Sequence, residues 1–192
     1  MLKFFKVVLM LALLLFPAIP PNAAVASGIS IETDPVTFPL SGYALHAFYR
    51  PEGISRLSIG AGTYSLKLPD IFIGMNSNNS DKGWSARING GASLFVEYDL
   101  TEEKDTPYAG LQLGSQEYRI ENGGASSSFA IFLAMLSIGY RWHIAGSEHF
   151  YLKPWAGVGY QSKVRGDNCV GAQCYDVQPA LGFATFHVGY TF

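Results

Sequence analysis

The chain has 192 residues, of which 13 are Lys or Arg and 15 are Asp or Glu, so its formal net charge is −2. This near balance argues against a nucleic-acid partner, which would favour a clustered basic face. Once an export signal is removed, the remaining length suits one domain.

The first 26 residues have the organisation of a secretory signal peptide. Lys3 and Lys6 precede an apolar run over residues 7–19, and Ala24 to Ala26 supply a small-residue cleavage site. The apolar run is shorter than the about 20 residues that a membrane-spanning helix needs. We therefore expect export, cleavage after Ala26 and a mature domain over residues 27–192.

Seven later segments alternate apolar and polar residues with the period of two that is typical of β-strands. They cover residues 43–50, 56–66, 91–100, 108–120, 129–143, 150–163 and 180–192. Single-chain bacterial barrels have an even number of strands, which places an eighth strand over residues 29–38. Pro35 and Pro39 in that segment count against it. The pattern predicts an all-β fold, an eight-stranded antiparallel up-and-down transmembrane β-barrel.

Connection lengths indicate an orientation for this barrel. Connections at 51–55, 101–107 and 144–148 are short, and those at 67–89, 120–128 and 164–176 are longer. Outer-membrane barrels alternate short periplasmic turns with longer outer loops. This places an aromatic girdle at the periplasmic ends of the strands, made of Tyr49, Tyr98, Tyr140, Trp142 and Tyr190.

If the apolar face points outward to lipid, the polar face lines the interior. The expected inward polar residues are His46, Arg50, Glu97, Asp99, Gln112, Arg141, Lys153 and His187. An eight-stranded barrel is only wide enough for side chains to fill it, and enclosed charges must be paired. We expect Glu97 and Asp99 to pair with cations among Arg50, Arg141 and Lys153. A narrow gated pathway or a small polar site is the alternative, and a soluble lipocalin-like barrel would invert the two faces.

Two loops carry further expectations. Cys169 and Cys174 are expected to form a disulfide, because an exported chain meets an oxidising environment. A metal site at the two cysteines would need more Cys or His ligands close by in the sequence, and the acidic residues of this loop do not have the spacing of a calcium-binding EF-hand. We therefore expect neither a metal site nor a cofactor. In the connection over residues 67–84, the apolar part 69–75 predicts a short helix. That connection either plugs the rim or forms a lid over an apolar entrance.

The C-terminal segment carries a resemblance. Phe186, Val188, Tyr190 and Phe192 alternate up to a terminal aromatic residue, which resembles the last strand of bacterial outer-membrane β-barrels and the signal read by their insertion machinery. The chain is similar to the group that includes the OmpA membrane domain, OmpW and the surface-antigen barrels. The resemblance implies a bacterial outer-membrane location, with lipid, the assembly machinery and periplasmic chaperones as partners. The oligomeric state stays open, and a monomer is favoured.

The same resemblance implies a function, for which alternatives remain. The first is a structural or surface-interaction role with a packed polar interior. The second is a narrow channel or carrier for small hydrophobic solutes, as in OmpW-like barrels. The third is a lipid-modifying enzyme, but Gly189 stands where the lipid A deacylase has a Ser two residues after its His, here His187. We therefore expect no enzymatic activity.

Overall fold

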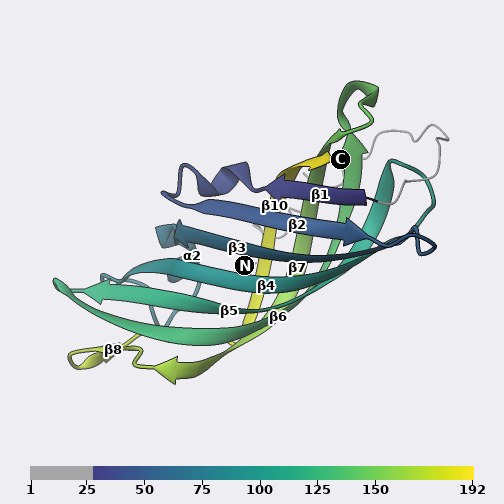
Figure 1. Cartoon of the computed structure of the whole chain (residues 1–192). Helices are drawn as coiled ribbons and strands as arrows, with labels where there is room; N and C mark the ends of the chain where they lie inside the picture. Colours follow the sequence, from purple (N-terminus) through teal and green to yellow (C-terminus); the bar gives the residue numbers. More distant parts are fainter. Residues whose placement is uncertain (1–27) are drawn as a thin grey trace.

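The computed structural model describes residues 28–192, so the predicted signal peptide over residues 1–26 lies outside the described part. Eight long strands dominate the fold (Figure 1). They are β1 (Gly28–Thr33), β2 (Tyr43–Arg50), β3 (Leu57–Lys67), β4 (Ser85–Asp99), β5 (Thr106–Asn122), β6 (Ala125–His143), β7 (Phe150–Gly166) and β10 (Ala180–Thr191).

The strands form one closed antiparallel sheet in the order β1-β10-β7-β6-β5-β4-β3-β2. The first and last strands close it through pairs such as Ser30 with Thr191 and Ile31 with Tyr190. The predictions of an all-β fold and of eight antiparallel strands are confirmed. Within residues 28–192, no helix is long and apolar enough to cross a membrane.

The first strand is shorter than predicted. β1 ends at Thr33, and a 3-10 helix, η1 (Pro35–Thr37), replaces the second half of the expected strand over 29–38. Asp34 caps this helix by accepting a hydrogen bond from the Val36 N–H at 2.9 Å. The fixed φ and missing N–H of Pro35 suit the start of a helix and not a ladder strand.

Two further predicted boundaries are wrong, both at the end of the sheet opposite the short turns. β4 begins at Ser85, earlier than the predicted start at residue 91. The pattern missed these first residues because a register shift between Ile88 and Gly90 interrupts the alternation of apolar and polar residues. The predicted connection over 120–128 is a two-residue turn, Gly123 and Gly124, with φ of +56° and +83°. Positive φ at both positions is what a tight hairpin needs, so β5 and β6 continue up to it.

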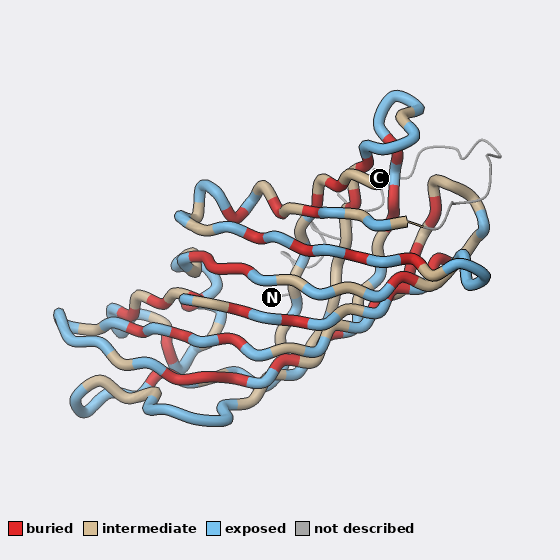
Figure 2. The backbone as a smooth tube through the Cα atoms, in the orientation of Figure 1, coloured by how far each residue is buried: buried red, intermediate tan, exposed pale blue. Residues whose placement is uncertain are grey.

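Buried and exposed residues alternate along many of the strands (Figure 2), because successive side chains of a strand point to opposite faces of the sheet. In β2, Ala44, His46, Phe48 and Arg50 are buried inside. Five ring side chains fit this narrow interior because each of them lies opposite a glycine on a neighbouring strand. The cross-strand pairs are His46–Gly62, Phe48–Gly60, Tyr64–Gly91, Tyr108–Gly139 and Tyr151–Gly189.

The end of the closed sheet that carries the longer connections, here called the loop end, is filled by an apolar cluster. The strands contribute Ala44, Tyr64, Leu66, Ala86, Ile88, Tyr118, Ile120, Phe129 and Ile131. Helix α2 (Asp70–Gly74) adds Ile73, and the loops add Trp84 and Tyr175. The predicted helix over 69–75 therefore packs into the rim, with Phe72 and Phe183 ring centroids 6.2 Å apart.

A small hairpin projects beyond β7. It consists of β8 (Cys169–Val170) and β9 (Gln173–Cys174), and the expected Cys169–Cys174 disulfide joins the two strands. At the opposite, turn end of the sheet, η2 (Ile144–Gly146) connects β6 to β7. The predicted short turns all lie at this turn end.

Candidate functional site

A cluster of six charged side chains fills the closed sheet near its turn end. It contains three carboxylates and three cations, and none of the six residues is more than 7% exposed. The members of this charge cluster are Glu32, Arg50, Glu97, Asp99, Arg141 and Lys153. They come from β1, β2, β4, β6 and β7, so closure of the sheet is what brings them together.

Lys153 joins two carboxylates from opposite parts of the sheet. Its Nζ lies 2.5 Å from Glu32 Oε1 and 2.9 Å from Glu97 Oε1. The ammonium group also lies 4.2 Å from the centroid of the Phe48 ring, a cation–π contact. The side chain is 1% exposed. Two carboxylates and an aromatic face together replace the water that this buried ammonium group loses.

Asp99 joins the other two cations. Its Oδ2 lies 2.7 Å from Arg50 Nη1 and 2.9 Å from Arg141 Nη1. Arg141 also reaches Glu97 Oε2 at 3.5 Å. Arg141 thus links the Asp99 pairs to the Lys153 pairs, and all three carboxylates of the charge cluster have a cationic partner.

His187 extends the charge cluster toward the middle of the interior. Its Nδ1 lies 2.9 Å from Glu32 Oε2, and its Nε2 accepts a hydrogen bond from Trp155 Nε1 at 3.1 Å. The Tyr151 hydroxyl donates to Glu32 Oε1 at 2.8 Å. Glu32 is therefore held by a lysine, an imidazole and a phenol.

His46 is buried beside His187 but makes no hydrogen bond. Neither of its ring nitrogens has a partner among the described residues, although the residue is only 5% exposed. Its ring centroid lies 4.8 Å from that of His187 and 4.9 Å from that of Phe95. Buried polar atoms are normally hydrogen bonded, so this exception requires an explanation.

The structure places the eight sequence-predicted polar residues inside the closed sheet. Arg50, Glu97, Asp99, Arg141 and Lys153 belong to the charge cluster, and His187 contacts it. Gln112 lies nearer the loop end and donates to Ser93 Oγ at 2.9 Å. The last of the eight, His46, is the residue without a partner.

Three contributors to this interior escaped the sequence analysis. Glu32 was not assigned to a face, because the strand that carries it was the least regular. Its signal was nevertheless present, since Ile29, Ile31 and Thr33 alternate with Ser30 and Glu32. Tyr151 and Trp155 were treated as parts of the strand pattern, although their positions share the parity of Lys153.

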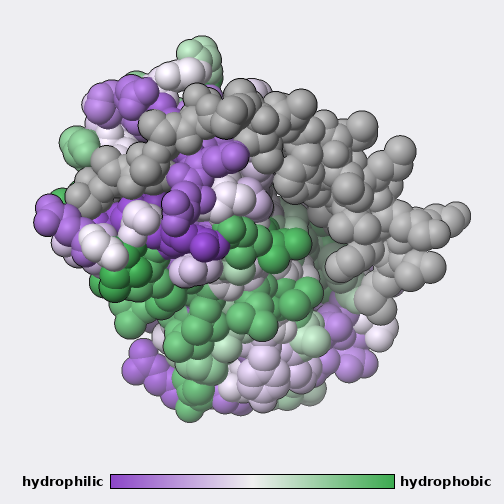
Figure 3. Space-filling view, turned by 90° about the vertical axis from the view of Figure 1, so that its right-hand side faces the viewer, coloured by the Kyte–Doolittle hydropathy of each residue, from purple (hydrophilic) through white to green (hydrophobic). Residues whose placement is uncertain are grey.

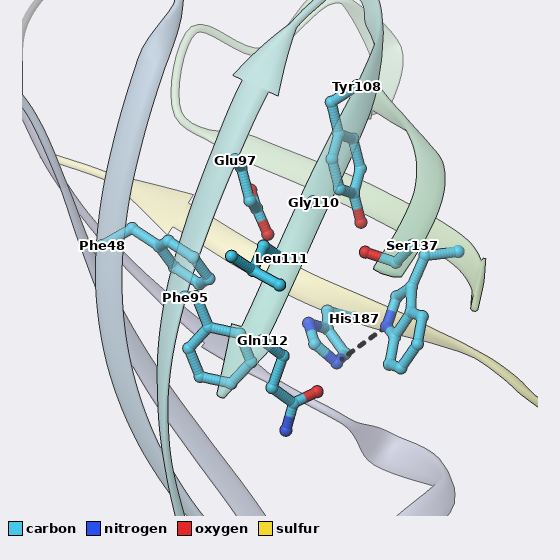
Figure 4. A pocket seen from close by; sticks show the side chains of 10 residues that line it. Phe48, Phe95, Glu97, Tyr108, Gly110, Leu111, Gln112, Ser137 and His187 are labelled. Atoms are coloured by element: carbon cyan, nitrogen blue, oxygen red, sulfur yellow. Dashed lines mark hydrogen bonds between the residues drawn. The ribbon is translucent and has the colours of Figure 1, made fainter. Parts of the chain in front are cut away.

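Little space remains inside. A cavity of about 20 Å³ lies beside His187, lined by residues that include Phe48, Phe95, Tyr108, Ser137 and Trp155. Figure 4 shows the two phenylalanine rings on one side of it and Tyr108 and Ser137 on the other. That volume is on the order of one water molecule. The side chains around this cavity therefore leave room for about one water beside His187.

At the loop end, Asp176 joins two connections that are far apart in sequence. Its Oδ2 accepts from Asn76 Nδ2 and from Asn78 Nδ2, both at 2.9 Å, and its N–H donates to Asn79 Oδ1 at 2.8 Å. The two amide donors lower the pKa of the Asp176 carboxyl below its ordinary value. Burial raises the pKa of the neighbouring Tyr175 to about 12. We call this set of contacts the loop latch.

The chemical capacity of the site follows from these partners. Glu32 orients the His187 imidazole through Nδ1, as a carboxylate orients a general base. Nucleophilic catalysis also needs a nucleophilic side chain hydrogen bonded to Nε2 of that imidazole. That nitrogen is bonded to Trp155, an indole N–H donor. The arrangement suits ion pairing and ligand binding by imidazole and carboxylate.

Comparison with known proteins assigns no relative to the chain: no family model matches it, and no curated protein matches it.

Proposed function

We propose that the chain is an integral outer-membrane β-barrel protein with a closed polar interior and a structural or surface-interaction role. The observation that carries the proposal is the outward face of the sheet, where large apolar side chains are exposed on several strands, among them β4 and β6. Leu94, Leu136 and Ile138 are 67%, 64% and 69% exposed. Monomeric soluble proteins rarely expose large contiguous apolar patches.

The extent of this apolar face suits a bilayer. On β5 the outward residues Pro107, Ala109, Leu111, Leu113 and Ser115 are uncharged, and Glu117 is the first charge toward the loop end. A transmembrane strand takes about 9–11 residues, which matches this uncharged length. The surface in Figure 3 has hydrophobic residues gathered in one patch with hydrophilic residues at its margins.

Aromatic side chains at the turn end support the same location. Tyr49, Tyr98 and Trp142 point outward and are 48%, 45% and 38% exposed. Amphipathic rings of this kind prefer the membrane–water interface. Tyr140, which the sequence also placed in this girdle, is buried.

The interior supports a closed barrel over a conducting one and over a soluble lipocalin-like one. A soluble barrel of that kind would hold apolar side chains inside, whereas this one holds six paired charges. A conducting pore requires a continuous aqueous path, and the described cavity is of about 20 Å³. The apolar cluster at the loop end and the loop latch close the other side.

The surface-interaction part of the role rests on the loop end. β4 to β7 extend past β1 to β3 there (Figure 1), and the loops carry a disulfide-bonded hairpin and the loop latch. An ordered, cross-linked set of loops offers a fixed surface for recognition.

Fractionation and gel migration test the proposal. The chain expressed with its leader in a Gram-negative host should sediment with outer membranes. Its folded form should migrate differently from a boiled sample, because closed membrane barrels resist unfolding in mild detergent. Recovery in the soluble periplasmic fraction, with no change on boiling, would reject the membrane proposal.

Bilayer recordings test the closed interior separately. The purified protein should give no single-channel currents in planar bilayers, with or without added small apolar solutes. Reproducible currents or solute flux would favour the channel or carrier function instead, and would leave the membrane location intact.

A further inference from the structure

The unpartnered His46 lies in a group of three potential metal ligands. Glu32, His46 and His187 each offer one ligand atom, and the three atoms lie within 4.8 Å of one another. All three residues are buried, with exposed fractions of 1%, 5% and 4%. Hydrogen bonding within the interior accounts for Glu32 and His187 but leaves both nitrogens of His46 without a partner.

The backbone holds the three residues on adjoining strands. Glu32 on β1 is the direct cross-strand partner of His46 on β2 and of Gly189 on β10, two residues beyond His187. The side chains thus project from three neighbouring strands of a closed sheet, a more rigid support than loops. Gly62 opposite His46 leaves room for the imidazole, since a Cβ at Gly62 would lie 2.2 Å from its ring.

We infer that Glu32, His46 and His187 bind one divalent transition-metal ion, with zinc as the best match. Two imidazoles and one carboxylate form a ligand set that zinc commonly takes, and cobalt can occupy the same kind of site. In a tetrahedral zinc site, bonds of about 2.0–2.2 Å place ligand atoms roughly 3.4 Å apart. The three ligand atoms reach that spacing by side-chain rotation.

Glu32 and His187 can exchange some of their hydrogen bonds for bonds to a metal ion. Lys153 keeps an ion pair with Glu97, at 2.9 Å and 3.2 Å, when Glu32 turns to a metal. Coordination through Nε2 costs His187 the hydrogen bond from Trp155, whereas coordination through Nδ1 puts the ring proton on Nε2 and costs the hydrogen bonds to both Glu32 and Trp155.

A single trapped water is the competing explanation for His46. The residues that line the 20 Å³ cavity include His187 but not His46. A water at the centre of this cavity would therefore lie beside His187 and would leave the His46 nitrogens without a hydrogen-bond partner. The metal site uses both nitrogen-bearing rings and the carboxylate. It needs only the interior of the closed sheet and does not rest on the membrane location.

The test uses the full mature chain, unfolded with a chelator and refolded with Co²⁺ or Zn²⁺, because the site is sealed in the folded state. About one ion per chain should remain after gel filtration. Bound Co²⁺ should give the visible absorption of a low-coordinate nitrogen and oxygen site, and X-ray absorption should detect two imidazoles. The loaded protein should also unfold at a higher temperature than the metal-free protein.

Variants locate the ion. His46→Gln and His187→Gln should each lower the affinity for Co²⁺ by at least about 100-fold, since even outer partners of metal sites change affinity 10–100-fold. His143→Gln is the matched control, because His143 is equally buried but pairs with Asp105 outside the group. Its affinity for Co²⁺ should match that of the unaltered chain.

Two results would overturn the inference. One is the absence of stoichiometric Co²⁺ and Zn²⁺ from the refolded, unaltered chain. The other is equal retention by the three histidine variants, which means surface binding. If the His46 and His187 variants fail to fold, the X-ray absorption of the unaltered protein decides, since a spectrum without imidazole excludes the site.

Discussion

Arg141 stabilises the interior through two carboxylates at once, and its loss should be costly. Arg141→Ala leaves Asp99 with Arg50 as its cationic partner and removes the 3.5 Å contact with Glu97. Breaking a buried ion pair costs about 3–5 kcal/mol in the free energy of unfolding. Denaturant unfolding in detergent measures this cost.

Arg119→Ala is the control for that measurement. Arg119 pairs with Glu121 at 3.0 Å, but both side chains are about half exposed. Exposed pairs contribute about 0–1 kcal/mol. Equal, small effects of the two substitutions would mean that water reaches the charge cluster.

The glycines opposite inward aromatic rings make a second prediction at the residue scale. A Cβ at Gly189 would lie 2.2 Å from Tyr151 Cζ, and Tyr151 bonds Glu32. Gly189→Ala should destabilise the protein by about 1–3 kcal/mol, the range for overpacking a filled interior. Gly90→Ala on β4, where no atom lies within 4 Å of an added Cβ, should change stability little. A harmless Gly189→Ala would contradict the close packing of this pair.

At the scale of elements, the loop latch should weaken in acid. The folded pKa of Asp176 is lowered, so its carboxylate contributes fully above the ordinary pKa of 3.8 and loses that contribution as pH falls through the lower folded value. The measurement is the rate at which pepsin cleaves within residues 76–80, in the unaltered chain and in Asp176→Asn. The rate for the unaltered chain, divided by the rate for Asp176→Asn, should rise as pH falls below 3.8. At the lowest pH the two cleavage rates should converge. If the ratio of the two cleavage rates stayed constant across this pH range, the stability of the loop latch would not depend on the charge of Asp176.

The pairing of β10 with β1 is the second element to test. The Phe192 N–H donates to Ile29 O at 2.9 Å, and the Phe192 and Tyr190 ring centroids lie 5.0 Å apart. Deletion of Phe192 should lower the yield of folded protein in membranes, measured by the heat-sensitive gel shift. Phe150→Ala removes a comparably placed aromatic contact with Tyr190 and should affect yield less. An undiminished yield after the deletion would count against the resemblance to an insertion signal.

At the scale of the whole molecule, the outward face distinguishes a membrane protein from a soluble one. Leu136 pairs with Leu111 and Val158 in neighbouring strands, within the apolar face. Leu136→Arg should cost about 2–4 kcal/mol in lipid vesicles if that face meets the bilayer midplane. In a soluble protein, a substitution at such an exposed position changes stability by about 0.5 kcal/mol or less.

Ile54→Arg serves as the control for Leu136→Arg. Ile54 is also apolar and 52% exposed, but it lies in the β2–β3 turn. Both substitutions are measured by urea unfolding in the same vesicles. Similar small costs for the two would indicate that Leu136 does not face lipid.

Local sequence determined the strands and the orientation of their side chains. Period-two alternation depends only on backbone geometry, so it identified seven strands and the inward parity of residues such as Arg141 and Lys153. It located β1 only in part, because the strand ends at Thr33 and Pro35 begins a 3-10 helix within the predicted range. The predicted connection over 120–128 was too long. Gly123 and Gly124 alone close the hairpin between β5 and β6, so both strands continue to this two-residue turn.

The tertiary structure alone decided which inward side chains meet. Lys153 and Glu32 are 121 positions apart and lie on strands that flank β10, so their contact depends on how β1 closes the sheet against β10. The same closure places His46 beside His187 without a hydrogen-bond partner. Alternation predicts the face of each residue, whereas the level at which residues meet inside depends on the register of every intervening strand pair.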